Sequence, residues 1–338
     1  MLRNTAIAYN GGHMKSINYT WAINEAIREE MERDKTVFIA GEDVAKIGGP
    51  FGATRGLLEK FGAKRVKDTP ISENTIVGLA VGAAATGLRP IVEVMFMDFF
   101  GLCLDQVYNQ AAKMRYTFAG AFKMPLVIRT LVGAENNIGP QHSQSMEAWL
   151  AHVPGLKVVM PSTVYDVKGL LKSAIRDDNP VVFIEHLAHY KIKGEIPEED
   201  YTLPIGVADI KRSGGDATIV ATGLMVQRAL NAAEILSREG IELEVIDPRT
   251  ISPLDGKTII GSVEKTGRLV VVTGSLKPCG IGAEIAAQVA EQNPSMLKAP
   301  VKRITPPFTP CPFGQRFEEF LYPKEHTIIE AVRDMLQP

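Results

Sequence analysis

The spacing of apolar residues along the chain changes repeatedly between the period of a helix and that of a strand. Residues 22–31 carry apolar side chains three or four positions apart, and residues 36–40 (TVFIA) form a short β-branched run typical of a buried strand. The same alternation continues to about residue 185. It predicts strands at 91–96, 126–130, 158–160 and 181–185, and helices at 76–86, 102–116 and 164–176. Such alternation is typical of a parallel sheet covered by helices on both faces.

A second alternating segment follows a break in this pattern. Residues 191–204 concentrate charge, Gly and Pro without an apolar period, which indicates a linker. The chain beyond it predicts strands at 217–221, 243–247, 269–273 and 301–305, and helices at 226–237, from 279 onward and at 327–336. The predicted fold class is α/β, with two doubly wound, mostly parallel domains at residues 14–195 and 208–338 and a linker at 196–207. Residues 1–13 are expected to be an expression leader, because residues 11–14 (GGHM) resemble a cloning junction.

Composition and charge narrow the class of protein. The 338 residues are 45% hydrophobic and 22% charged with a formal net charge of −2, an ordinary globular composition without a basic field for nucleic acid or an anionic membrane. The sequence has no apolar run of the roughly 18 residues that indicates a membrane-spanning helix, and no secretory signal pattern. The three cysteines lie far apart without metal-ligand spacing, so free thiols are expected. We therefore expect a cytoplasmic protein.

Two short motifs carry titratable residues. Residues 68–74 read DTPISEN and place Glu73 just before the predicted helix at 76–86, and residues 139–145 read GPQHSQS and place His142 in a loop. A first-turn glutamate is favoured by the helix dipole, and a loop histidine is commonly structural. Together, however, a carboxylate and an imidazole are suited to moving protons at a small organic substrate.

These motifs, in this order and on either side of the aromatic run at 95–100 (MFMDFF), resemble the beta subunit of the thiamine-diphosphate-dependent 2-oxo-acid or acetoin dehydrogenases. The resemblance runs from about Thr20 to the C-terminus. It implies a transketolase-like pyrimidine-binding domain followed by a transketolase C-terminal-like domain. It further implies that Glu73 shares a proton with N1′ of the thiamine aminopyrimidine, that Phe99 packs on this ring and that the backbone of Ile71 accompanies it. His142 would exchange protons with bound intermediates and during lipoyl transfer, with Ser143 and Gln144 as candidates to orient it.

One family motif is missing from the chain. The family binds the diphosphate and magnesium through a Gly-Asp-Gly sequence, which occurs nowhere here. The resemblance therefore implies that a separate alpha subunit holds the diphosphate and magnesium, that thiamine diphosphate is shared between the two chains, and that they form a heterotetramer of two alpha and two beta subunits. Its further partner would be the lipoyl domain of a dihydrolipoamide acyltransferase core.

The end of the predicted helix at 164–176 resembles a potassium site of mammalian relatives. Terminal helix carbonyls lack intrahelical partners, and together with a carboxylate and an amide they are suited to a monovalent cation. The matching positions are Leu126, Ala174, Ile175, Asp177 and Asn179. The alternative is an ordinary helix end stopped by Pro180.

The substrate is the least constrained prediction. Residues 95–106, 109–113 and 184–186 resemble acetoin dehydrogenases more than pyruvate dehydrogenases, and the wall at 95–104 contains no Lys or Arg to pair with a substrate carboxylate. Acetoin is therefore expected, with pyruvate or a branched-chain 2-oxo acid as the alternative. Two other classes stay open: a nucleotide-binding protein that uses Gly280 and Gly282, and a non-catalytic scaffold.

Overall fold

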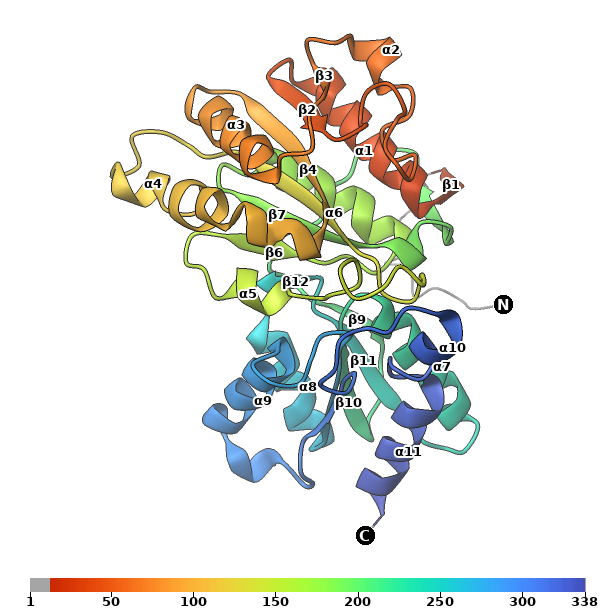
Figure 1. Ribbon diagram of the computed structural model, residues 1–338. Coiled ribbons are helices and arrows are strands. Elements are labelled where there is room, and N and C mark those ends of the chain that lie inside the picture. The colour runs from red at the N-terminus through yellow and green to blue at the C-terminus, as the bar shows by residue number, and fades with distance from the viewer. Residues whose placement is uncertain (1–12, 338) are drawn as a thin grey trace.

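The computed structural model describes residues 13–337 and arranges most of them around two sheets (Figure 1). The first sheet has seven strands in the order β12-β6-β7-β5-β4-β2-β3, and the second has five in the order β14-β13-β10-β11-β9. Only the edge strands β12 and β9 pair in an antiparallel manner within these two sheets. The predicted α/β fold class, with mostly parallel sheets, is confirmed.

The first sheet is covered by helices on both faces. Helices α1 (Tyr19–Arg33) and α6 (Val164–Arg176) pack against each other on one face, and α3 (Glu73–Ala85) packs on the other (Figure 1). The strands on which they pack are buried almost throughout, as the continuous apolar runs indicated. The central strands are β2 (Val37–Gly41), β4 (Arg89–Phe96), β5 (Val127–Val132), β6 (Lys157–Val159) and β7 (Val181–His186), and β3 (Val66–Asp68) is an edge strand.

The helix predicted at 102–116 is not a continuous α-helix. The chain forms a 3-10 helix, η1 (Met97–Leu102), then a π-helical turn, η2 (Gln106–Ala111), and then the short α4 (Met114–Thr117). Cys103, Val107 and Ala111 are fully buried at a spacing of four residues. A spacing of four exceeds the 3.6-residue period of an α-helix, so a wider turn keeps all three side chains on the buried face.

The predicted linker is more ordered than its composition indicated. Lys193–Pro197 forms β8, which pairs with β1 (Met14–Asn18) in a separate antiparallel ribbon. Tyr201 and Leu203 then bury their side chains in the core of the first domain, against Gly169 of α6. The segment at 196–207 is therefore tethered to the first domain. Apart from His13, the predicted leader lies outside the described residues.

The second sheet is also flanked by helices. Its strands are β9 (Asp209–Arg212), β10 (Ala217–Ala221), β11 (Leu243–Asp247), β13 (Leu269–Val272) and β14 (Lys302–Ile304). Its helices are α7 (Leu224–Ser237), α8 (Gly256–Thr266), α9 (Ile281–Gln292) and α11 (Glu325–Leu336). The pattern did not predict β9 or α8. It also missed β12 (Thr250–Ser252), which leaves this domain and extends the first sheet beside β6.

Buried charges reinforce the connection between the domains. Arg249 donates from Nη2 to Asp209 (2.8 Å) and lies 2.6 Å from a carboxylate oxygen of Asp166, which α6 of the first domain contributes. Lys211 also pairs with Asp166 and Asp209. Asp166 is fully buried, and cations of the second domain balance its charge. Removing these cations would leave an uncompensated buried charge, which costs free energy. Buried ion pairs therefore hold the two domains together.

No helix among residues 13–337 combines the length and the apolar character needed to cross a bilayer.

Candidate active site

Glu73 is a buried residue whose side chain makes no hydrogen bond to the described part of the chain. The turn after β3 is anchored by Asp68, whose Oδ1 accepts from the Ala45 amide (2.7 Å), and α3 then begins at Glu73. The Glu73 side chain is only 6% exposed, and no donor among residues 13–337 reaches it. Burial raises the pKa of the Glu42 carboxyl, and the nearby Glu73 charge raises it further. The same two causes, in the same order, raise the pKa of the Cys103 thiol to about 12. An unpaired buried carboxylate of this kind is a candidate for a group that meets a ligand.

The residue before α3 does not cap the helix with its side chain. Ser72 occupies the N-cap position but makes no capping bond to the backbone, and its Oγ donates instead to the Thr75 hydroxyl (2.8 Å). Ile71, one residue earlier, is 80% exposed. A large apolar side chain therefore projects beside Glu73.

His142 lies against two phenylalanine rings. Its imidazole meets Phe96 and Phe99 edge to face, with ring centroids 4.9 and 5.4 Å apart. Neither ring nitrogen has a hydrogen-bond partner within the described part of the chain. Ser143 and Gln144, the candidates to orient the ring, make no hydrogen bond to it among residues 13–337: the Gln144 side chain donates to Asp98 (2.8 Å), and the Ser143 backbone carbonyl accepts from the Tyr322 hydroxyl. The imidazole is thus positioned by aromatic packing, and its nitrogens remain available for proton transfer.

One short segment connects the two titratable groups. Phe99 of η1 touches His142, and Cys103, directly after η1, lies within electrostatic reach of Glu73. Phe99 and His142 thus lie against each other and Glu73 lies near the end of η1, while no direct contact joins Glu73 to His142 within the described part of the chain. The folding of η1 therefore brings together motifs that are far apart in the sequence.

Sequence reasoning missed Asp98 as part of this site. Its Oδ1 accepts from the backbone and side chain of Gln144, its Oδ2 is buried without a partner, and burial raises the pKa of its carboxyl. An acidic residue inside the otherwise apolar run at 95–100 was the available signal.

His186 and His189 are internal residues. They are 6% and 1% exposed, and burial lowers the pKa of each to about 3, which keeps both neutral at physiological pH. His186 Nδ1 accepts from the Ala188 amide (3.2 Å), as in an ordinary turn. Neither residue has the exposure or the charge expected of a group that receives substrate.

Gly280 and Gly282 serve packing in this structure. A Cβ at Gly280 would lie 2.4 Å from the Leu276 carbonyl, and one at Gly282 would lie 3.3 Å from Val271 of β13. These glycines allow the start of α9 to approach its neighbours closely. This packing role explains both glycines, so nucleotide binding is not needed to explain them.

The oxygens predicted to bind potassium gather where α6 ends, but protein donors already engage them. The Leu126 and Ala174 carbonyls accept from the Val181 and Asp177 amides, at 2.8 and 3.3 Å. The Ile175 carbonyl accepts from Arg89 Nη1 at 3.0 Å.

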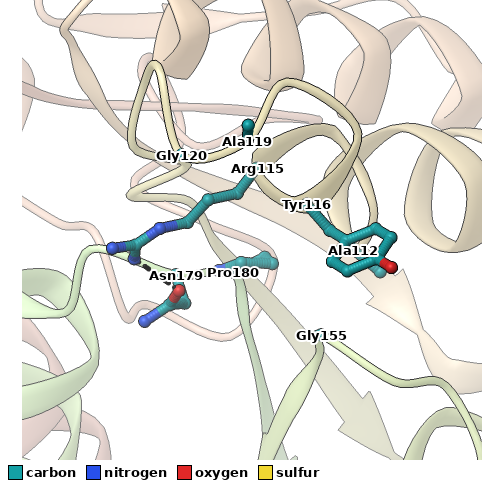
Figure 2. A pocket seen from close by; sticks show the side chains of 8 residues that line it. All are labelled: Ala112, Arg115, Tyr116, Ala119, Gly120, Gly155, Asn179 and Pro180. Carbon is teal, nitrogen blue, oxygen red and sulfur yellow. Dashed lines mark hydrogen bonds between the residues drawn. The ribbon is translucent and has the colours of Figure 1, made fainter.

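Cationic side chains complete this arrangement. Lys157 pairs with the Asp177 carboxylate, and Arg115 Nη1 donates to Asn179 Oδ1 (2.6 Å; Figure 2). Positive charge is therefore already supplied near these oxygens, and the potassium site stays a prediction. Arg115 and Asn179 also line a groove with Tyr116 and Pro180, which lies beside this helix end and shares no residue with the Glu73 and His142 site (Figure 2).

Comparisons with known proteins agree with the fold. Residues 15–193 match the family "Transketolase, pyrimidine binding domain", and residues 206–328 match "Transketolase, C-terminal domain". A solved structure described as "Split gene transketolase, inactive beta4 tetramer" superposes with a TM-score of 0.78 at 22% identity, covering 95% of this chain and 98% of that one. The likeness to that structure shows the same fold. The matched family models and the fold therefore define a transketolase-like protein with a pyrimidine-binding domain.

Relatives of known name narrow the class further. The chain is 49% identical over 333 residues to acetoin:2,6-dichlorophenolindophenol oxidoreductase subunit beta of Cupriavidus necator, covering 96% of this chain and 98% of the relative. It is 47% identical to the Bacillus subtilis protein of the same name (95% and 97% covered) and 44% identical to the pyruvate dehydrogenase E1 component subunit beta of that species (96% and 100% covered). The chain belongs to the family of beta subunits of thiamine-diphosphate-dependent acetoin and 2-oxo-acid dehydrogenases.

Proposed function

We propose that this chain is the beta subunit of an enzyme that cleaves acetoin with thiamine diphosphate and passes the acetyl unit to a lipoyl domain. The observation that carries the proposal is the unpaired, buried Glu73 carboxylate at the start of α3. A buried acceptor without a donor fits a protonated ring nitrogen, which is what the pyrimidine end of the cofactor presents. The names of the most similar relatives reported above support acetoin as the substrate.

The side chains of this site have distinct proposed roles. When bound, thiamine diphosphate supplies the nucleophile for cleaving a carbon–carbon bond beside a carbonyl. Glu73 holds and returns a proton at the pyrimidine nitrogen N1′, while Phe99 and Ile71 provide apolar contacts for the ring. His142 gives and takes protons at substrate oxygens. The phenylalanine rings around His142 exclude water from this exchange.

A partner chain completes the proposed enzyme. The chain contains no Gly-Asp-Gly motif, so an alpha subunit is proposed to hold the diphosphate and magnesium in a heterotetramer of two alpha and two beta subunits. Four large aromatic side chains near the C-terminus are exposed, and exposed apolar surface of this kind supports an assembly. They are Phe308, Phe313, Phe317 and Phe320, each at least 70% exposed. The potassium site stays a prediction that the arrangement around Asn179 does not favour.

The assembled enzyme is expected to cleave acetoin with a higher kcat/KM than it shows for pyruvate or branched-chain 2-oxo acids. The segment from 95 to 104 has no Lys or Arg, and its one charged side chain is the acidic Asp98, placed beside His142. A neutral ketone needs no counter-ion there, whereas a buried substrate carboxylate does. Rates with dichlorophenolindophenol as electron acceptor, measured side by side on one preparation, test this expectation.

Pyruvate is the second candidate, because the pyruvate dehydrogenase relative covers the chain equally well. A kcat/KM for pyruvate above that for acetoin would assign the 2-oxo acid as substrate. His142 or the partner chain would then have to pair with the carboxylate.

A further inference from the structure

The loop that carries His142 contains an unusual alternation of backbone conformations. Glu135, Asn137 and Gly139 have φ angles of +65°, +58° and +79°, and the residues between them do not share this sign. Glycine and asparagine tolerate this left-handed region, but a glutamate rarely adopts it. A residue is held in such a conformation only where surrounding interactions determine it.

Those interactions come from the second domain. Glu318, at the end of α10 (Gln315–Glu318), is 2% exposed and accepts from the Glu135 amide with Oε1 (2.5 Å) and from the Asn137 amide with Oε2 (2.7 Å). Backbone N–H groups that converge from alternating conformations form an anion-binding nest. Here the anion is a side chain that lies more than 180 positions away in the sequence.

The loop also contributes a carboxylate that pairs with cations of the second domain. Glu135 pairs with Arg228 of α7 and with Lys324, the latter at 2.9 Å. Further along the loop, a Cβ at Gly139 would lie 2.8 Å from the Phe313 ring, so only glycine fits there. Residues of the second domain therefore contact the loop at both Glu135 and Gly139.

We propose that Glu318 is a positioning residue for His142. The His142 backbone carbonyl accepts from the Gly133 amide (3.0 Å), which ties the backbone that carries the imidazole to the base of the same loop that Glu318 holds. Without the carboxylate, Glu135 and Asn137 lose the partner of their amides and relax toward negative φ. His142 then shifts on the Phe99 ring, and its proton transfer slows. This inference rests on the proposed proton-transfer role of His142.

Glu318→Gln tests the proposal, because it keeps the side-chain size and replaces one acceptor oxygen with an amide that faces an N–H group. Hydrogen exchange of the 133–145 peptide in the full chain is expected to quicken about tenfold or more, as for loss of a charge-assisted hydrogen bond. In the assembled enzyme we expect kcat for acetoin to fall about tenfold with a much smaller change in KM. Its pH–rate profile should also shift, whereas a smaller fraction of folded enzyme would lower kcat equally at every pH.

Glu319→Gln is the matched control, since Glu319 is the exposed neighbour and its carboxylate accepts, among residues 13–337, only from Gln315 (3.1 Å). It should change neither measurement. Glu318→Asp keeps the charge and should recover part of the protection, which keeps the test decisive if Glu318→Gln folds poorly. Unchanged exchange and unchanged kcat in Glu318→Gln would overturn the proposal. His142→Ala separates the two claims: if it alone slows turnover, the positioning role fails and the proposed function stands.

Discussion

Glu73→Gln is expected to abolish turnover in the assembled enzyme while leaving the fold and the assembly intact. The carboxylate is buried at the start of α3 and has no partner within the described chain, so its loss breaks no internal hydrogen bond. An amide has nearly the same shape but does not hold and return a proton at the pyrimidine nitrogen. General acid–base steps contribute ~10²–10⁴-fold, and kcat should fall by at least the lower of these factors.

Glu59→Gln on α2 (Leu57–Phe61) is the matched control, because it makes the same chemical change at an exposed helical position. It should retain full activity. Circular dichroism and gel filtration of both variants check the fold and the assembly. A Glu73→Gln enzyme that keeps more than about a tenth of the wild-type rate would remove Glu73 from the proposed chemistry.

The chain by itself is expected neither to bind thiamine diphosphate tightly nor to turn over acetoin. The site described above offers contacts for the pyrimidine end alone, and the sequence has no Gly-Asp-Gly motif for the diphosphate and magnesium. Titration calorimetry with cofactor and magnesium, first with this chain and then with chain plus partner, measures the difference. Submicromolar binding by the isolated chain would contradict the division of the cofactor between two subunits.

The local parts of the fold and the site were predictable because local patterns encode them. Short β-branched runs fixed β5 and β7 to within two residues, since strands buried on both faces must be apolar throughout. Glu73 was likewise expected beside the helix that it begins. The 102–116 region failed because its apolar period suits both an α-helix and a wider turn, and packing decides between them.

Contacts between distant segments were not predictable in the same way. Strand β12 pairs with β6 in the first sheet, although its neighbours in the sequence belong to the second sheet. The spacing of apolar residues predicts a strand but does not indicate which strand it pairs with. Glu318 shows the same limit: as one acidic residue in an aromatic segment, it gave no sign that it holds the loop carrying His142. Asp98 could have been found, because a carboxylate within an apolar run needs a reason to be there.

The most direct test of the central claim is an experimental structure of the assembled enzyme with thiamine diphosphate bound. The account predicts that N1′ of the pyrimidine lies within hydrogen-bonding distance of the Glu73 carboxylate, about 2.6–3.2 Å, with the ring against Phe99. It also predicts that the diphosphate and magnesium contact the partner chain. A pyrimidine ring bound away from Glu73, or a diphosphate held by this chain alone, would contradict it.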